Sequence, residues 1–150
     1  MIDALGRPID GRGALAEVRW RPLESDPVGS VTRARIERPL DLGLRALNTF
    51  ATVGQGMRLG IFAGSGVGKS SLLGQITRGT DADVVVCCLV GERGREVRGF
   101  VEEVLGEDGR SKSVLVVATS DRAPIERYLA PFVAVTVAEH FRDEGKDVLL

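Results

Sequence analysis

The stretch GIFAGSGVGKSSLLGQ, residues 60–75, decides the fold of this 150-residue chain. An apolar run ends in a loop of glycine, serine and valine, Lys69 follows, and leucines return behind it. Residues 63–70 fit the phosphate-binding loop pattern with one departure, since Ala63 stands where the pattern begins with glycine. The pattern predicts a buried strand at residues 57–63, then the loop, then a helix at residues 69–79.

The residue types in this loop suit the binding of a nucleoside triphosphate. Glycines let the backbone adopt positive φ and approach a phosphate closely, and successive N–H groups then converge on the anion at the positive end of the following helix. We expect Lys69 to reach the β- and γ-phosphates, Ser70 to ligate Mg²⁺ and Ser71 to contact the α-phosphate. The predicted ATP-binding residues are Gly64, Ser65, Gly66, Val67, Gly68, Lys69, Ser70 and Ser71. The competing interpretation is an ordinary glycine-rich turn between a strand and a helix.

Hydrolysis of a bound triphosphate needs a group that orients or deprotonates the attacking water. Glu92 follows the next apolar strand, 23 positions after Lys69, and the carboxyl ends of parallel strands share one edge of a sheet. We therefore predict Glu92 as the carboxylate that polarises water. Arg93 is predicted to contact the γ-phosphate or to hold Glu92 in place, and Arg95 and Glu96 are interpreted as interface or supporting charges. The alternative for GERGRE, residues 91–96, is a solvated charged turn.

The remaining pattern predicts an α/β fold with a parallel sheet wrapped by helices. Apolar strands are expected at residues 82–91 and 113–120, and a last strand begins at residue 147. Helices are expected at residues 94–106, with Gly106 as the stop, and at residues 121–146, with Asp121 as a possible cap and Pro131 as a kink or a sign of a later start. Apolar residues at helical spacing also predict a helix within residues 40–50. Asp147 lies at the start of its strand, which is the wrong end for a Mg²⁺ ligand.

Composition excludes several classes of protein. Hydrophobic residues make up 43% and charged residues 27% of the chain, which is typical of a globular domain. A net charge of −1 argues against a nucleic-acid-binding surface, which usually carries a basic stripe. The apolar run at residues 84–90 is too short for a membrane helix, and the first residues lack the apolar core of a signal peptide. Cys87 and Cys88 are neighbours in a strand, so they are expected to be unbonded, buried thiols.

Several motifs together resemble one known family. AGSGVGKSSLLG at residues 63–74, followed by LVGERGREVRGFVEEVLG at residues 89–106, resembles the flagellar and type III secretion export ATPases, relatives of the catalytic subunits of rotary ATP synthases. LGRPIDGRG at residues 5–13 and APFVAVTVAEHFRDEGKDVLL at residues 130–150 are similar to further parts of that family. The glycine in GERGREV looks like the export branch, since synthase β subunits tend to read GERTREG.

The resemblance implies a RecA-like P-loop NTPase core that binds ATP with Mg²⁺ in a ring homo-hexamer, with active sites between subunits. It implies that residues 1–20 are the tail of an N-terminal β-barrel, residues 21–39 a linker and residues 40–150 an ATPase core, incomplete at its C-terminal end. The metal-binding aspartate, the adenine-stacking aromatic residue and the arginine from a neighbouring subunit are expected beyond residue 150. We therefore expect the 150-residue chain to hydrolyse ATP weakly or not at all by itself.

The resemblance also implies a cytoplasmic location at the inner-membrane export gate, where the partners are the export apparatus and its secreted protein substrates. It allows peripheral association with the membrane and implies no nucleic-acid partner.

Three other functions remain as alternatives. A rotary synthase catalytic subunit is disfavoured by the glycine in GERGRE, and a non-hydrolysing ring subunit is disfavoured by Glu92, because such subunits carry glutamine there. A nucleic-acid motor is disfavoured by the near-zero net charge and the low aromatic content of 5%.

Overall fold

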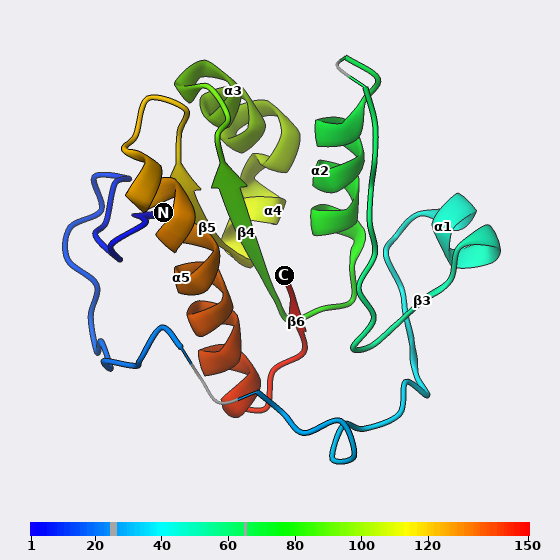
Figure 1. The fold of residues 1–150 in the computed structure, drawn as a ribbon. Helices are drawn as coiled ribbons and strands as arrows, with labels where there is room; N and C mark the ends of the chain where they lie inside the picture. The colour runs from blue at the N-terminus through cyan, green and yellow to red at the C-terminus, as the bar shows by residue number, and fades with distance from the viewer. Residues whose placement is uncertain (25–26, 65) are drawn as a thin grey trace.

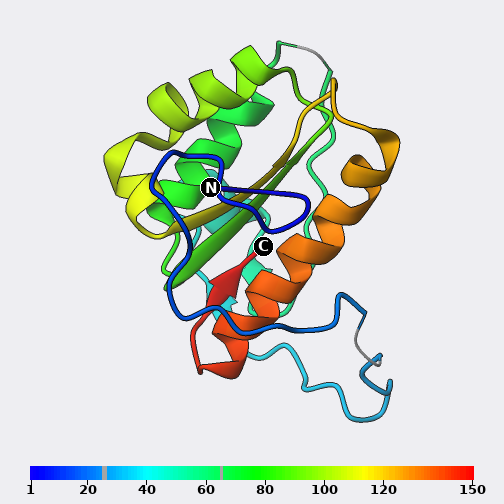
Figure 2. The ribbon, with the colours of Figure 1, turned by 90° about the vertical axis from the view of Figure 1, so that its left-hand side faces the viewer.

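The computed structural model describes residues 1–24, 27–64 and 66–150 and shows a three-layered α/β fold. The central parallel sheet has the strand order β1-β5-β4-β6, and a separate antiparallel pair joins β2 to β3. Figure 2 shows the sheet between α5 on one side and the other long helical segments on the opposite side. The strands are β1 (Ile2–Asp3), β2 (Pro39–Leu40), β3 (Val53–Gly54), β4 (Val84–Val90), β5 (Ser113–Ala118) and β6 (Val148–Leu149). The helices are α1 (Arg45–Phe50), α2 (Lys69–Gly79), α3 (Gly94–Gly99), η1 (Phe100–Leu105), α4 (Gly106–Ser111) and α5 (Pro124–Asp143) (Figure 1).

The centre of the sheet is the parallel pair of β4 and β5, in register from Val85 opposite Ser113 to Val90 opposite Ala118. Both strands are apolar without polar alternation because helices cover both faces of the sheet. Successive side chains point to opposite faces, so Cys88 packs under α5 while Cys87 packs under α3 and η1. Both cysteines are free, as expected. Burial raises the pKa of both thiols, that of Cys88 to about 11, so they behave as small apolar residues.

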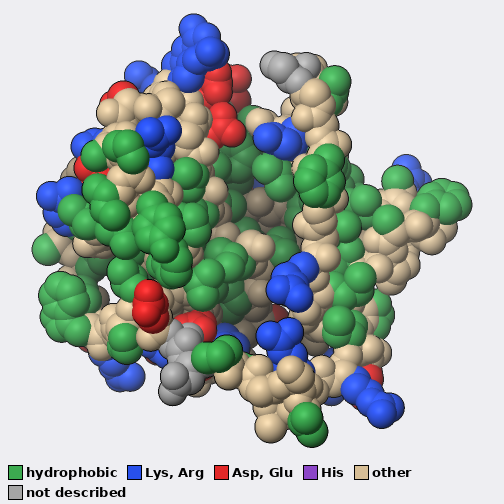
Figure 3. Space-filling model, in the orientation of Figure 1, with side chains coloured by type: hydrophobic (Ala, Val, Ile, Leu, Met, Phe, Trp, Pro, Cys, Tyr) green, Lys and Arg blue, Asp and Glu red, His purple; other side chains and the backbone are tan. Residues whose placement is uncertain are grey.

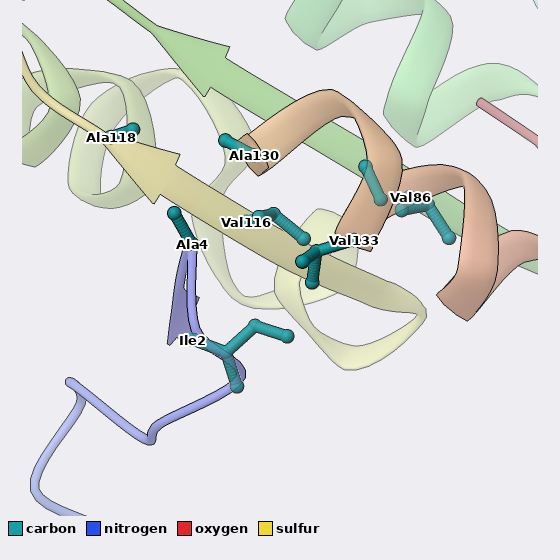
Figure 4. Packing of buried hydrophobic residues seen from close by; sticks show 8 residues of the cluster. Ile2, Ala4, Val86, Val116, Ala118, Ala130 and Val133 are labelled. Atoms are coloured by element: carbon teal, nitrogen blue, oxygen red, sulfur yellow. The ribbon is translucent and has the colours of Figure 1, made fainter. Parts of the chain in front are cut away.

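Helix α5 covers one face of the sheet and seals it with small and branched side chains. The buried cluster brings Ile2 and Ala4 from the N-terminus and strand residues into contact with the helix (Figure 4); its members are Ile2, Ala4, Val86, Val116, Ala118, Ala130, Val133 and Ala134. The helix begins at Pro124, behind an N-cap at Ala123, so the expected cap at Asp121 is wrong. It then runs through Pro131, which removes one backbone hydrogen bond without ending the helix, since the buried face continues on both sides.

The helical segment on the opposite face is longer and less regular than the sequence predicts. α3 passes directly into a π-helical segment, η1, whose Phe100, Val101 and Leu105 are buried against β5. Gly106 is the C-cap of η1 and takes a positive φ of 63°, as expected for the predicted stop. The sequence did not predict the short helix α4, which follows directly and runs to Ser111.

The strand predicted at residues 57–63 is also wrong within the described part of the chain. The segment runs beside α2 (Figure 1), and Ile61 packs into the cluster that contains Leu72 and Ile76 of α2. None of the described strands pairs with it, and a strand exists only where backbone N–H and C=O groups find a partner. Phe62, in the same segment, is 97% exposed. The helix expected within residues 40–50 is observed as the short helix α1. None of the residues of α1 is buried.

The N-terminal residues belong to the core sheet. β1 pairs with β5 in parallel, placing Ile2 opposite Val116. Ile2 is buried beneath α5, so Ile2 and Asp3 add an edge strand to this sheet. The assignment of residues 1–20 to the tail of a β-barrel and the boundaries of the other domains stay predictions. Among the described residues no helix is both long and apolar enough to cross a membrane.

Asp3 ties this edge strand to the turn that follows it. Its carboxylate accepts hydrogen bonds from the backbone N–H of Leu5 at 2.8 Å and of Arg7 at 2.9 Å, and it pairs with the Arg7 guanidinium at 2.7 Å. Burial alone would raise the pKa of this carboxyl group. The hydrogen bonds and the Arg7 charge outweigh burial, so the pKa lies below its ordinary value of 3.8.

We predict that Asp3→Asn lowers the free energy of unfolding by about 1–2 kcal/mol near neutral pH, because hydrogen bonds to a buried charge are lost. A carboxyl group whose pKa is depressed by folding stabilises the fold above its unfolded pKa and loses that effect as pH falls through the folded pKa. The difference between wild type and variant should therefore shrink below about pH 4. Urea unfolding between neutral and acidic pH measures it, with the exposed Asp108→Asn as control; a pH-independent difference would contradict the charge argument.

A close backbone contact joins the segment ahead of α1 to the C-terminal end of α2. Gly43 and Gly79 face each other backbone to backbone, so a Cβ on Gly79 would lie 2.8 Å from the Gly43 Cα and 3.2 Å from the Leu42 carbonyl oxygen. A hydrogen bond from the Asp81 amide to the Asp41 carbonyl oxygen, at 3.1 Å, closes the same contact. This contact anchors the segment that leads into the phosphate-binding loop.

We predict that Gly79→Ala lowers the free energy of unfolding by about 1–3 kcal/mol, because the added methyl group meets rigid backbone. Gly99→Ala is the matched control, since Gly99 is also helical and a Cβ there meets nothing within 4 Å. Thermal or urea unfolding of the two variants gives the comparison. Equal free energies of unfolding for the two variants would contradict the prediction, because they would show that the backbone at Gly43 moves aside without loss of stability.

Candidate active site

The glycine-rich loop ahead of α2 owes its shape to backbone conformation. Gly66 and Gly68 have positive φ angles of 76° and 96°, a region that side chains with a Cβ rarely adopt. A Cβ at Gly64, Gly66 or Gly68 would meet nothing within 4 Å, so crowding does not explain these glycines. Ser65, one of the predicted nucleotide ligands, lies outside the described residues.

The first amides of α2 have no hydrogen-bond partner among the described residues. Gly68 is the N-cap, no side chain caps the helix, and no acidic residue lies in the first turn. The first intrahelical hydrogen bond runs from the Leu72 amide to the Gly68 carbonyl oxygen at 2.9 Å, so the amides of Lys69, Ser70 and Ser71 lack helical acceptors. Unpaired amides and the positive end of the helix dipole together form a binding site for an anion such as phosphate.

A cavity of about 480 Å³ joins this helix end to the carboxyl end of β4. Figure 3 shows the hollow beside α2, with acidic and basic side chains on its rim. On the loop and α2 it is lined by Gly64, Gly66, Gly68, Lys69, Ser70, Ser71 and Leu73, and on the other side by Leu89, Glu92, Glu96, Val97 and Phe100. The structure thus brings Lys69, Ser70, Ser71 and Glu92 together as predicted from the sequence.

The sheet fixes the backbone of Glu92. The Gly91 amide bonds the Ala118 carbonyl oxygen at 2.8 Å, and the Ser120 amide bonds the Glu92 carbonyl oxygen at 3.0 Å. These bonds extend the β4–β5 ladder by one step and hold the turn after β4 against the turn after β5. The Glu92 side chain therefore enters the cavity from an anchored backbone.

Glu96 lines the same cavity, which sequence reasoning missed. Glu96 lies in the first turn of α3, four residues after Glu92. This spacing of about one helical turn from a candidate catalytic carboxylate is the sequence feature that could have predicted it. A hydrogen bond with Glu92 lowers the pKa of Glu96, and Arg93 lowers it further through an ion pair at 3.1 Å. Arg93 is not among the cavity-lining residues, so in this structure it touches the site through Glu96.

The remaining predicted residues divide between the two sides of the site. Lys69 has no ion-pair partner among the described residues, which leaves its ammonium group available to a phosphate. Val67 is 68% exposed and does not line the cavity. Asp147 lies at the opposite end of the parallel sheet from Glu92, where its backbone amide bonds Asp83 at 2.9 Å, in agreement with its expected position away from the site.

A parallel α/β core, a glycine loop that opens a helix and a carboxylate at the end of the neighbouring strand define a P-loop ATPase core. The model of the ATP synthase alpha/beta family, nucleotide-binding domain, matches residues 43–150, and the chain belongs to that family.

Relatives from bacterial export systems match the whole chain. A flagellum-specific ATP synthase of Pseudomonas aeruginosa is 48% identical over 150 residues, which cover 100% of this chain and 33% of the relative. A type 3 secretion system ATPase of Xanthomonas euvesicatoria is 50% identical, with 100% and 34% covered. These relatives confirm the resemblance to flagellar and type III export ATPases, although the chain spans only about a third of their length.

Solved structures confirm the fold. A prototypical ATPase from the type III secretion system of pathogenic bacteria superposes with a TM-score of 0.90 at 49% identity, covering 98% of this chain and 42% of that one. The assembled ATPase EscN of enteropathogenic E. coli, in complex with its central stalk EscO, superposes with a TM-score of 0.91 at 49% identity, covering 98% and 36%.

We predict that Arg93→Ala raises the pKa of Glu96, because the ion pair that favours its charged form is removed. Arg95→Ala is the matched control, since Arg95 has no ion-pair partner in the described part of the chain. A carbon-detected NMR titration of the glutamate side chains measures both variants against wild type. An unchanged Glu96 titration in Arg93→Ala would mean that this ion pair does not form in solution.

Proposed function

We propose that this chain is the nucleotide-binding part of an ATPase that hydrolyses Mg-ATP in a ring homo-hexamer and energises flagellar or type III protein export. The observation that carries the proposal is the shared cavity, in which the unpaired amides of α2 and Lys69 face Glu92 and Glu96. The similarity to export ATPases, which extends over nearly all of this chain, supports the choice of this branch over a rotary synthase. Glu92 in the cavity argues against a subunit that binds nucleotide without cleaving it.

Each side of the cavity has its own task in the proposed reaction. The loop amides and the first amides of α2 hold the phosphate chain, and Lys69 neutralises charge on its terminal groups. Glu92 accepts a hydrogen bond from the attacking water and orients it toward the γ-phosphate. Arg93 keeps Glu96 in place beside Glu92 through their ion pair.

The cavity also suits Mg²⁺. The Ser70 hydroxyl and the carboxyl groups of Glu92 and Glu96 are hard oxygen donors, the ligand type that Mg²⁺ prefers. Ser70 would hold the ion directly from the first turn of α2. When bound, Mg²⁺ supplies neutralisation of phosphate charge.

The assembly and location follow from the same relatives. A homo-hexamer with active sites between subunits is the assembly that the family resemblance implies, and the relative EscN was solved in an assembled state with its stalk. We place the protein at the cytoplasmic face of the inner membrane, where the export apparatus and secreted proteins are its partners. Peripheral contact with the membrane accompanies that position.

We predict that Lys69→Ala weakens Mg-ATP binding about 10- to 100-fold, the equivalent of losing one charge-assisted hydrogen bond of roughly 1.5–3 kcal/mol. Glu92→Gln should keep binding within a few-fold of wild type while hydrolysis falls by a factor of about 10²–10⁴. Calorimetry or ligand-induced thermal stabilisation measures binding, and phosphate release measures hydrolysis. Lys146→Ala is the matched lysine control, because Lys146 lies ahead of β6 and is not among the residues that line the cavity.

Phosphate release should be followed over a range of protein concentrations, because sites shared between subunits become active only on assembly. Activity per chain is expected to rise with concentration for wild type and to stay low for Glu92→Gln. Loss of nucleotide binding in Glu92→Gln, or full hydrolysis by it, would refute its assignment.

A further inference from the structure

The tightest approach at any glycine of the chain lies in the middle of α2. A Cβ added to Gly74 would overlap the Val104 Cγ1 atom and lie 3.0 Å from the Val104 carbonyl oxygen. Gly74 is buried inside the helix, where glycine is less favourable than alanine. The close approach of η1 explains why glycine stands there.

The two elements that meet at this contact carry the two sides of the cavity. α2 begins at Lys69, five residues before Gly74, and presents Lys69 and Ser70 to the cavity. η1 continues α3 without interruption, and α3 carries Glu96. α2 and η1 pack side by side, so the separation of their axes at Gly74 sets how far the carboxylates stand from the phosphate-binding end of α2.

The glycines of the facing helical segment, from α3 to α4, do not meet α2 in this way. A Cβ at Gly94 or Gly99 would meet nothing within 4 Å. At Gly109 the nearest atoms are side-chain atoms of Arg78 and Leu105 at 3.3 Å, and the Arg78 side chain is flexible. Only at Gly74 does the overlap include a branched side chain with its own backbone directly behind it. The partner also lies in a π-helical turn, an irregularity found often beside functional sites.

We propose that Gly74 is a positioning residue for the ATP hydrolysis proposed above. Its missing side chain lets α2 and η1 close until Val104 touches the α2 backbone, and this distance places Glu92 and Glu96 opposite the terminal phosphate held at Lys69. The phosphate contacts belong to the loop and to α2, so they move with α2 as one unit. Glu96 lies on α3, which continues into η1, and Glu92 lies directly ahead of α3 at the end of β4. A change in the spacing between α2 and η1 therefore disturbs hydrolysis and spares binding.

The test is Gly74→Ala measured for both binding and turnover. We expect the Kd for Mg-ATP to change less than about threefold, while kcat falls about 10- to 100-fold, since a misplacement of 1 Å costs about that much. Gly99→Ala, a helical glycine with open space around it, should leave both values near wild type. Adding Val104→Ala to Gly74→Ala removes the overlapping Cγ1 atom and should return kcat to within about fivefold of wild type.

The outcomes separate this proposal from the one on which it rests. A wild-type protein that does not bind Mg-ATP, or that fails to hydrolyse it in the assembled ring, refutes the proposed ATPase itself. A wild-type protein that hydrolyses ATP, with Gly74→Ala equal to it, overturns the positioning role alone. A kcat loss that Val104→Ala does not relieve, or an equal loss of affinity, also overturns it, because that pattern describes general damage.

If Gly74→Ala does not fold, Val104→Leu enlarges the same contact from the η1 side. It should then show the same loss of kcat with Kd preserved, and an unchanged kcat would overturn the proposal.

Discussion

The parallel pairing of β4 with β5 is the constraint on which the rest of this structure depends. Its apolar side chains cover both faces, so α5 must pack on one side and α3 with η1 on the other. The ladder runs to Val90 opposite Ala118, and the hydrogen bonds just beyond it anchor the Glu92 backbone at the edge of the sheet where α3 begins. Burial of valine and leucine thus determines the place of a polar residue that is itself only half-buried.

The cavity carries a positive charge on one side, at Lys69, and carboxyl groups on the other, at Glu92 and Glu96. Lys69 stands at the uncapped end of α2, while Glu92 and Glu96 interact with each other and Arg93 pairs with Glu96 from outside the cavity. Two carboxyl groups this close to each other repel when both are charged, and a nearby arginine relieves that cost. The amides of α2 and Lys69 would hold the phosphates of a bound triphosphate, and Glu92 and Glu96 would supply carboxylate oxygens on the other side of the cavity. In our proposal, the Gly74 contact between α2 and η1 sets the distance between these two sides.

The local sequence pattern predicted those elements correctly whose burial is visible in their own residues. The helix predicted at residues 69–79 is α2 as observed, and the two apolar strands lie within their predicted ranges, because periodicity and unbroken apolar runs encode burial directly. Prediction failed where a partner decided the outcome. Residues 57–63 have the composition of a strand but no described neighbour to pair with.

The sequence by itself determined the chemistry: a glycine loop that requires positive φ at Gly66 and Gly68, a lysine at the start of a helix, and a carboxylate placed after an apolar strand. These depend on residue type and on spacing along the chain, which the sequence carries in full. Only the tertiary structure decided that Glu96 enters the cavity, that Arg93 serves it from outside, that Ile2 joins the sheet and that Gly74 touches Val104. Each of these is a distance between segments far apart in the chain or a direction of one side chain, and both are set by packing.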